Sequence, residues 1–115
     1  GLVEVTGYVD RDMDARALKC ELGQTPFEDG IMIGNKGIVC GTGDKFATSK
    51  PEIACDIVDM EAYAIAKTCL KEEVDFRSFK YISDSADENS ANDWEENVHK
   101  GNKLFQTMLY RAGLN

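Results

Sequence analysis

The pattern of hydrophobic positions is clearest within Ile53–Asp87, where its period changes twice. The segment Ile53–Val58 is short, apolar and partly β-branched, which predicts a strand. Residues Asp59–Glu73 are almost wholly apolar through the first turns of a helical pattern, which predicts a buried helix. Aromatic and apolar residues in Phe76–Ile82 predict the next strand. Together they predict a βαβ unit with neighbouring parallel strands and a right-handed crossover.

Similar patterns predict the remaining elements. Alternation in Leu2–Val9 predicts a strand, Lys36–Cys40 predicts a short one, and the Pro and Gly residues of Gln24–Asn35 predict a loop. A single helix is predicted over Asn92–Ala112, capped by Asn92 or by Ser90. Its apolar positions at helical spacing are Trp94, Val98, Phe105, Met108, Leu109 and Ala112. These elements predict an α/β fold in three layers around a central mixed sheet.

Composition and charge narrow the class of protein. The 115 residues are enough for one small domain, and 43% hydrophobic with 30% charged residues is typical of a soluble globular chain. The net charge of −8 argues against a nucleic-acid or membrane surface, because both select clustered Lys and Arg. No apolar run has transmembrane length and no signal peptide is visible, so a cytoplasmic protein is expected. The first residue is Gly rather than Met, which suggests a fragment or a processed form.

The cysteines and the one Gly-x-Gly motif argue against a metal or a cofactor. Cys20, Cys40, Cys55 and Cys69 have no C-x-x-C spacing, and they are interpreted as reduced core thiols, with two disulfides as the alternative. One His and no close Cys pair argue against a zinc site. Residues Gly41–Asp44 contain Gly-x-Gly without the third Gly of a dinucleotide site, which favours a tight turn. The sequence therefore predicts neither a metal nor a cofactor.

Acidic residues follow both strands of the predicted βαβ unit. Asp59 and Glu61 lie where the first strand gives way to the helix, and Asp84 follows the second strand. If the two strands are parallel neighbours, these acids project from the same carboxyl edge, where open α/β sheets bind ligands. The alternative is structural, because an acid in a first helical turn favours the dipole and an Asp after a strand forms turns. Spacing alone favours the structural alternative.

The residues themselves carry a resemblance. The run from Val58 to Ala62 (Val-Asp-Met-Glu-Ala), followed by the run from Ser83 to Asp87 (Ser-Asp-Ser-Ala-Asp), resembles the methylthioadenosine/S-adenosylhomocysteine nucleosidases of the purine nucleoside phosphorylase superfamily. The resemblance spans nearly the whole chain but only the C-terminal half of that family's domain. It implies a three-layer α/β fold of the nucleoside phosphorylase type, here partial, with residues 1–115 forming the C-terminal portion of a single domain. It also implies hydrolysis of the N-ribosidic bond of adenine nucleosides in methionine salvage, with release of adenine.

The resemblance also assigns the residues that hold the sugar and cleave the bond. Cleavage builds positive charge on the ribose and negative charge on the leaving base, so protonating the base lowers the barrier. Asp84 is implied to be the general acid, with Ser83 orienting it. Glu61 is implied to accept hydrogen bonds from the ribose hydroxyls and to favour the developing cation. Met60 is implied to pack under the sugar or the base.

Further residues are implied to bind the base and the substituent on the five-prime carbon. Phe46 would stack on the purine, and Ala47 would offer backbone groups to the base edge. Trp94 would contact the five-prime substituent. Leu18 and Pro26 belong to a segment that, by the resemblance, reaches across a dimer interface into the partner's pocket.

One catalytic part is missing from the resemblance. The family's water-activating Glu lies in the N-terminal half of its domain, and no residue here matches it, so a missing N-terminal half is expected. A homodimer is also expected, because half a sheet exposes an edge and an apolar face. Two alternatives stay open at this point. Besides a nucleosidase, these are part of a purine nucleoside phosphorylase and a non-catalytic remnant that binds a nucleoside.

Overall fold

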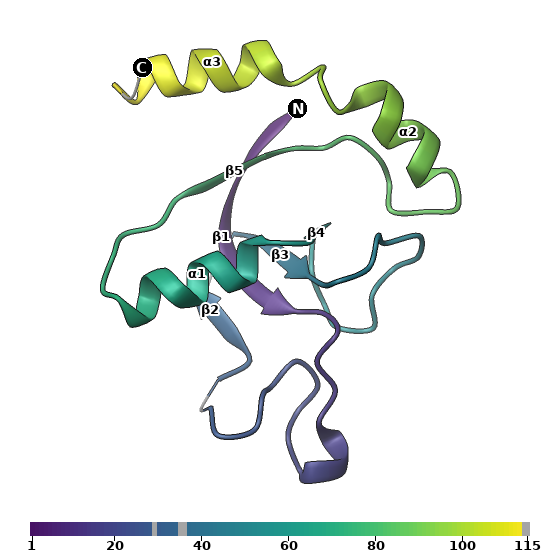
Figure 1. Ribbon diagram of the computed structural model, residues 1–115, viewed down its shortest axis with the longest axis vertical. Helices are drawn as coiled ribbons and strands as arrows, with labels where there is room; N and C mark the ends of the chain where they lie inside the picture. The colour runs from purple at the N-terminus through teal and green to yellow at the C-terminus, as the bar shows by residue number, and fades with distance from the viewer. Residues whose placement is uncertain (29, 35–36, 114–115) are drawn as a thin grey trace.

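The chain folds around an open mixed sheet (Figure 1). The computed structural model describes residues 1–28, 30–34 and 37–113. In this part, strands pair in the order β2-β1-β3-β4, and β5 pairs with β1. The strands are β1 (Leu2–Asp10), β2 (Met32–Gly34), β3 (Ile38–Thr42), β4 (Ile57–Asp59) and β5 (Ser78–Tyr81). The helices are α1 (Ala62–Lys71), α2 (Ser90–Asn97) and α3 (Asn102–Arg111), and a 3₁₀-helix covers Arg16–Leu18. The predicted α/β fold with a central mixed sheet is confirmed.

Strand β1 organises the sheet because it pairs with three others. It is parallel to β3 and antiparallel to both β2 and β5, while β4 is parallel to β3. The predicted βαβ unit is therefore wrong: β4 and β5 are not paired with each other, and β5 runs antiparallel to β1. The physical reason lies in the length of β1. Neither β2 nor β3 reaches Leu2–Glu4, so β5 satisfies the backbone hydrogen-bonding groups there.

Several elements are shorter than their patterns predict. Strand β4 starts at Ile57 rather than Ile53. Directly before it, the Asp56 amide donates to the Val39 carbonyl and the Asp56 carboxylate accepts from the Val39 amide, both at 2.8 Å. Strand β5 lacks both ends of the predicted Phe76–Ile82. Helix α1 starts after Asp59, because that residue still belongs to β4.

The single C-terminal helix predicted over Asn92–Ala112 is wrong. A turn separates α2 from α3, with Asn102 N donating to His99 O at 3.3 Å. Gly101 lies in this turn against Tyr81, where an added Cβ would lie 2.5 Å from Cγ of the ring. The close packing on β5 therefore needs a glycine and bends the chain, although the apolar periodicity continues through it. Helix α2 begins at Ser90 and its N-cap residue is Asn89, so neither Asn92 nor Ser90 is the cap.

The loop predicted over Gln24–Asn35 contains a strand within its described residues. Residues Met32–Gly34 form β2 and pair with Gly7–Val9 of β1. A three-residue strand is too short to show alternation in sequence, which explains the miss. The start of the strand predicted from Lys36, like Asn35, lies outside the described residues.

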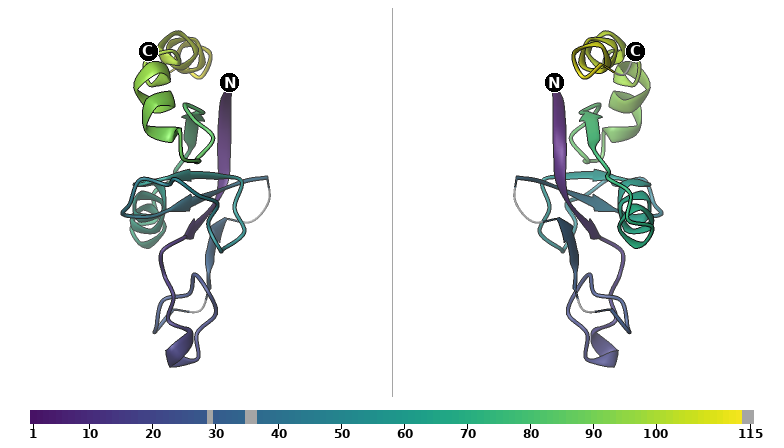
Figure 2. Two further views of the ribbon diagram at one scale, coloured as in Figure 1. Left: turned by 90° about the vertical axis from the view of Figure 1, so that its right-hand side faces the viewer. Right: turned by 90° about the vertical axis from the view of Figure 1, so that its left-hand side faces the viewer.

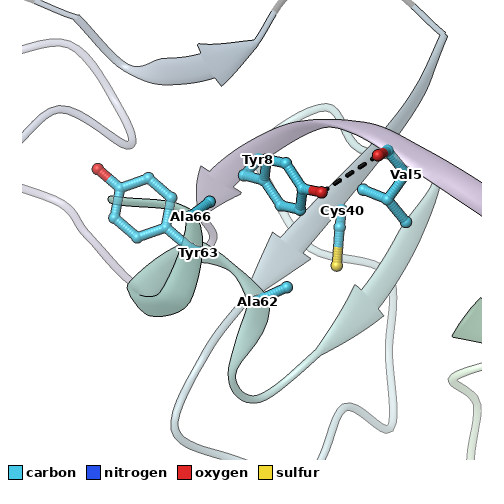
Figure 3. Packing of buried hydrophobic residues seen from close by; sticks show 6 residues of the cluster. All are labelled: Val5, Tyr8, Cys40, Ala62, Tyr63 and Ala66. Atoms are coloured by element: carbon cyan, nitrogen blue, oxygen red, sulfur yellow. Dashed lines mark hydrogen bonds between the residues drawn. The ribbon is translucent and has the colours of Figure 1, made fainter. Parts of the chain in front are cut away.

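The core lies between the sheet and α1. Its buried residues come from β1, β3 and α1, and Figure 3 shows them packed together: Val5, Tyr8, Cys40, Ala62, Tyr63 and Ala66. The Tyr8 hydroxyl donates to the Val5 carbonyl at 3.1 Å, which satisfies the polar end of a buried ring. The prediction that all of α1 is buried is wrong. The helix packs on β1, β2 and β3, but Ile65 and Leu70 are exposed, the latter in the last turn of the helix.

Candidate functional site

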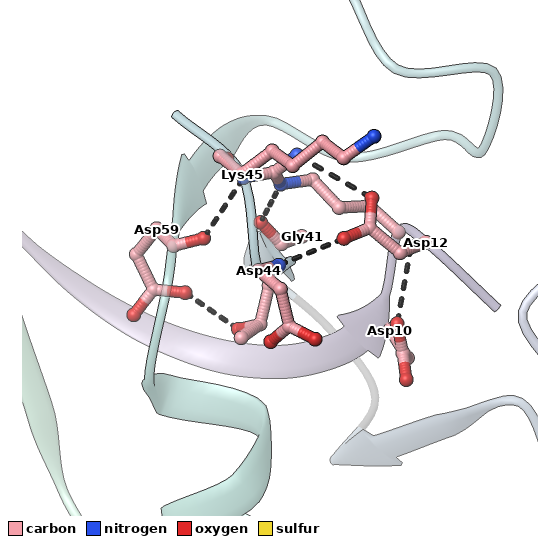
Figure 4. Close-up of polar contacts among 8 residues, drawn as sticks. Asp10, Asp12, Gly41, Asp44, Lys45 and Asp59 are labelled. Atoms are coloured by element: carbon pink, nitrogen blue, oxygen red, sulfur yellow. Dashed lines mark hydrogen bonds and ion pairs between the residues drawn. The ribbon is translucent and has the colours of Figure 1, made fainter. Parts of the chain in front are cut away.

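Three chain segments meet at one edge of the sheet. Strands β1, β3 and β4 are mutually parallel, so their carboxyl ends lie together. The segments that follow them are Asp10–Asp12, Thr42–Phe46 and Asp59–Glu61. Figure 4 shows the polar contacts among these segments, in which Asp12 lies against Asp44 and Asp59 lies across the end of β3.

Asp59 is the centre of these contacts, and its side chain is only 8% exposed. Its Oδ1 accepts a hydrogen bond from Thr42 Oγ1 at 2.5 Å, and its Oδ2 accepts one from Ala62 N at 2.8 Å. Lys80 Nζ forms an ion pair with the same Oδ2 at 2.9 Å. We call Thr42, Asp59, Ala62 and Lys80 the Asp59 cluster. It links β3, the start of α1 and β5, which are far apart in sequence.

Ionisation within this cluster follows from its burial and its donors. Burial alone would raise the pKa of Asp59, but hydrogen bonds from Thr42 and Lys80 outweigh it and hold that pKa below its ordinary value. Burial, together with the neighbouring Asp59 carboxylate, raises the pKa of the Cys40 thiol to about 12. Cys40 is therefore a protonated core thiol at neutral pH rather than a nucleophile.

Four of the predicted site residues lie on the segments next to the Asp59 cluster. Phe46 and Met60 are 42% and 43% exposed, Glu61 is exposed and Ala47 is half-buried. Glu61 is the N-cap residue of α1, yet its side chain makes no capping hydrogen bond, and the carboxylate that bonds the first turn is that of Asp59. Glu61 therefore does not cap α1 with its side chain, and the residue is exposed. The structural alternative, an acid that favours the helix dipole, needs no such bond and stays open.

Ser83 and Asp84 follow β5 and are both half-buried. The Ser83 hydroxyl donates to Asp84 Oδ2 at 3.0 Å, and Ala86 N donates to Asp84 Oδ1 at 2.8 Å. Asn97 Nδ2 of α2 donates to the Ser83 carbonyl at 2.9 Å. The predicted reason for bringing Asp84 and Glu61 together, two parallel neighbouring strands, is wrong. What connects β5 with the Glu61 segment is the ion pair of Lys80 with Asp59.

The remaining predicted residues lie apart from one another. Trp94 is exposed on α2, and Leu18 is exposed on the 3₁₀-helix, while Pro26 is half-buried in the following loop. The 3₁₀-helix lies at the opposite end of the molecule from α2 and α3 (Figure 2). Within one chain, the structure therefore does not assemble Leu18 with Trp94.

The described part of the chain contains two cavities that lie away from the predicted site residues. One, of about 590 Å³, lies between β1, β5 and α3. The other, of about 400 Å³, lies between α1 and the residues Phe27, Glu28, Gly30, Met32 and Ile33. Neither is lined by a predicted site residue.

The residues described here include no group of three or more His, Cys, Asp or Glu suited to a metal ion. None of the helices in that same part is long and apolar enough to cross a membrane.

A family model of the phosphorylase superfamily matches residues 2–112. The chain belongs to the phosphorylase superfamily. This finding confirms the resemblance carried by the two acidic runs. A comparison with curated proteins found no significant match.

Solved structures of the phosphorylase superfamily share this fold. The 5′-methylthioadenosine/S-adenosylhomocysteine nucleosidase of Helicobacter pylori, complexed with a pyrrolidin-3-ol compound, aligns with a TM-score of 0.81 and 26% identity over 96% of this chain. The futalosine hydrolase of Helicobacter pylori aligns with a TM-score of 0.79 and 26% identity over 86% of this chain. The Neisseria meningitidis nucleosidase, in complex with methylthio-immucillin-A, aligns with a TM-score of 0.70 and 27% identity over 84%. This chain spans 60%, 53% and 53% of these three proteins.

The sequence did not single out Thr42 and Arg11 as residues that organise these contacts. Thr42 was part of a Gly-x-Gly run interpreted as a tight turn, but its hydroxyl also accepts a hydrogen bond from Tyr63 N at 2.9 Å. Arg11 follows the predicted strand Leu2–Val9, and its side chain is only 8% exposed. A basic residue directly after an apolar strand was the available signal, although it does not distinguish a buried guanidinium from a solvated one.

Proposed function

We propose that this chain is the C-terminal portion of a nucleosidase domain that hydrolyses the N-ribosidic bond of adenine nucleosides. We take methylthioadenosine and S-adenosylhomocysteine as the substrates, because two of the similar structures are nucleosidases named for them. The observation that carries the proposal is the Asp59 cluster. Its members Thr42, Ala62 and Lys80 lie close in sequence to Phe46, Glu61 and Asp84, respectively. One buried carboxylate thus ties together the three segments that carry the proposed base, sugar and acid contacts.

The proposed chemistry divides among three side chains. Phe46 stacks on the purine, and its exposed ring is free to meet a base. Glu61 accepts hydrogen bonds from the ribose hydroxyls, for which its carboxylate is not engaged in capping α1. Asp84 donates a proton to the departing adenine, held by the hydroxyl of Ser83. Met60 beside Glu61 packs under the sugar, and Ala47 beside Phe46 offers backbone groups to the base edge.

The proposal includes parts beyond this chain. A water activator comes from the portion of the domain that the relatives have and this chain does not cover. A homodimer brings Leu18 and Pro26 of one copy to the five-prime pocket of the other, near Trp94. The exposure of Leu18, away from α2 in its own chain, supports this assignment. The enzyme works in the cytoplasm, in methionine salvage.

Isothermal titration calorimetry of the 115-residue chain with adenine and with methylthioadenosine tests the proposed function. Saturable binding of both is expected. A folded chain that binds neither compound at millimolar concentration overturns the proposal. The alternative of a purine nucleoside phosphorylase is tested by repeating the titrations with inorganic phosphate. If binding requires phosphate, the phosphorylase alternative replaces hydrolysis.

Phe46→Ala should weaken adenine binding by about 1–3 kcal/mol, the magnitude of base–aromatic stacking. The ring is 42% exposed, so its removal should leave the melting temperature nearly unchanged. Calorimetric titration with adenine measures the loss. Tyr110→Ala, at an exposed aromatic residue of α3, is the matched control and should bind adenine as the wild type does. Equal adenine affinity in wild type and Phe46→Ala would show that Phe46 does not contact the base.

Glu61→Gln should weaken methylthioadenosine binding about tenfold and leave adenine binding unchanged, because a charged hydrogen bond to the ribose is lost. The fold should persist, since the Glu61 side chain does not cap α1. Titrations with both compounds measure the difference, and Glu73→Gln at the end of α1 is the matched control. A Glu61→Gln chain that unfolds, or that loses adenine and nucleoside binding equally, contradicts the ribose assignment.

A further inference from the structure

Arg11, at the carboxyl end of β1, is a buried cation to which the proposed chemistry gives no role. Its Nε donates to the Gly41 carbonyl at 3.1 Å. Its Nη2 donates to the Lys45 carbonyl at 2.6 Å and to the Asp59 carbonyl at 3.3 Å. The guanidinium thus bridges the segment after β3 and the end of β4. Its side chain is 8% exposed, so these bonds form where little water competes for them.

The neighbouring residues fit around this guanidinium. Asp12 lies 3.6 Å from Arg11 Nη1 and also accepts a hydrogen bond from Asp44 N at 2.7 Å. Gly43 passes so close that an added Cβ would lie 2.8 Å from Arg11 Cζ and 2.5 Å from Asp12 Oδ2. Arg11 and Asp12 therefore both contact the backbone of Gly43–Lys45, directly before Phe46.

We propose that Arg11 is a positioning residue that sets the spacing between the Gly43–Phe46 loop and the Asp59–Glu61 segment. This inference rests on the proposed function for the ligand, since these two segments carry the purine and ribose contacts. A nucleoside must meet both segments at once, whereas adenine alone meets only the loop. Lys keeps the charge, but its single ammonium on a flexible stem does not reproduce the planar bridge of a guanidinium. The spacing, rather than the charge, is therefore what Arg11 supplies.

Arg11→Lys tests the inference in the 115-residue chain. The ratio of methylthioadenosine affinity to adenine affinity should fall about tenfold, because the two segments no longer keep one spacing. Hydrogen exchange should accelerate about tenfold at the amides of residues 43–46 and remain unchanged in the core of β1 and β3. Arg77→Lys is the matched control. Arg77 is an exposed Arg that pairs with Glu4 at 3.1 Å, and its replacement should change neither quantity.

The outcomes separate this inference from the proposed function. If the wild-type chain binds both compounds and Arg11→Lys leaves the affinity ratio unchanged, the positioning role is overturned. If the wild-type chain binds neither compound, the proposed function fails, and hydrogen exchange alone decides whether Arg11 fixes the loop. If Arg11→Lys does not fold, Gly43→Ala displaces the guanidinium instead and should give the same affinity and exchange changes. Unchanged exchange at residues 43–46 in a folded variant overturns the inference.

Discussion

The 115-residue chain alone should release adenine from methylthioadenosine far more slowly than the Helicobacter pylori nucleosidase does. Asp84 can supply a proton and Glu61 can hold the sugar, but water must still be aimed at the anomeric carbon. A positioned base contributes ~10²–10⁴-fold to such a step. The resemblance assigns that base to the part of the domain that this chain does not cover. Phe46, Met60 and Glu61 are also exposed to solvent in this chain.

Chromatography of adenine released by the purified chain, with Asp84→Asn as the control, measures this rate. A chimera that joins the chain to the uncovered part of the Helicobacter pylori enzyme should gain activity without added phosphate. Robust release by the chain alone that depends on Asp84 would contradict the prediction. It would place a water activator among the residues present, and Asp87 and Glu88, which follow Asp84, would be replaced first.

Asp59→Ala should lower the free energy of unfolding by about 2–4 kcal/mol, since a buried carboxylate with several donors is removed. Thr42 Oγ1 and Ala62 N lose their acceptor, and the ammonium of Lys80 loses its partner. Lys80 is 30% exposed, so solvent compensates part of its loss. Urea unfolding measures the change, with Asp75→Ala at an exposed acid as the control. A loss no larger than that of Asp75→Ala would show that the cluster does not stabilise the fold.

The same cluster predicts a direction for the pH dependence of stability. The pKa of Asp59 is lower in the folded chain than its ordinary value of 3.8. Its contribution is therefore fully present above that value and is lost as the pH falls through the folded-state pKa. Below pH 3.8, wild-type stability should fall more steeply than that of Asp59→Asn, in urea unfolding at a series of pH values. Parallel pH profiles for the two chains would contradict this assignment.

Part of the site was predictable because its signals are local. The acids at the carboxyl end of β4 and after β5 stand out in sequence, and the two runs that contain them carry the resemblance to the superfamily. The contacts that organise the site were not predictable. Asp59 bonds Thr42 and Lys80, and Arg11 bonds the carbonyls of three later residues. Such pairings join residues distant in sequence, and a charged residue has the same local pattern whether it is solvated or buried.

By itself, the sequence determined that β1 is a strand, that α1 is a helix and that the chain belongs to the superfamily, since each depends on the order of neighbouring residues. The tertiary structure alone decided that β5 pairs with β1, that Gly101 separates α2 from α3, and that β2 exists. Periodicity indicates which side of a helix or strand is apolar. It does not indicate which strand edge the element pairs with, or which side chain it packs against. Strand partners depend on the backbone groups left unpaired elsewhere, and a turn at Gly101 depends on the Tyr81 ring that packs against it.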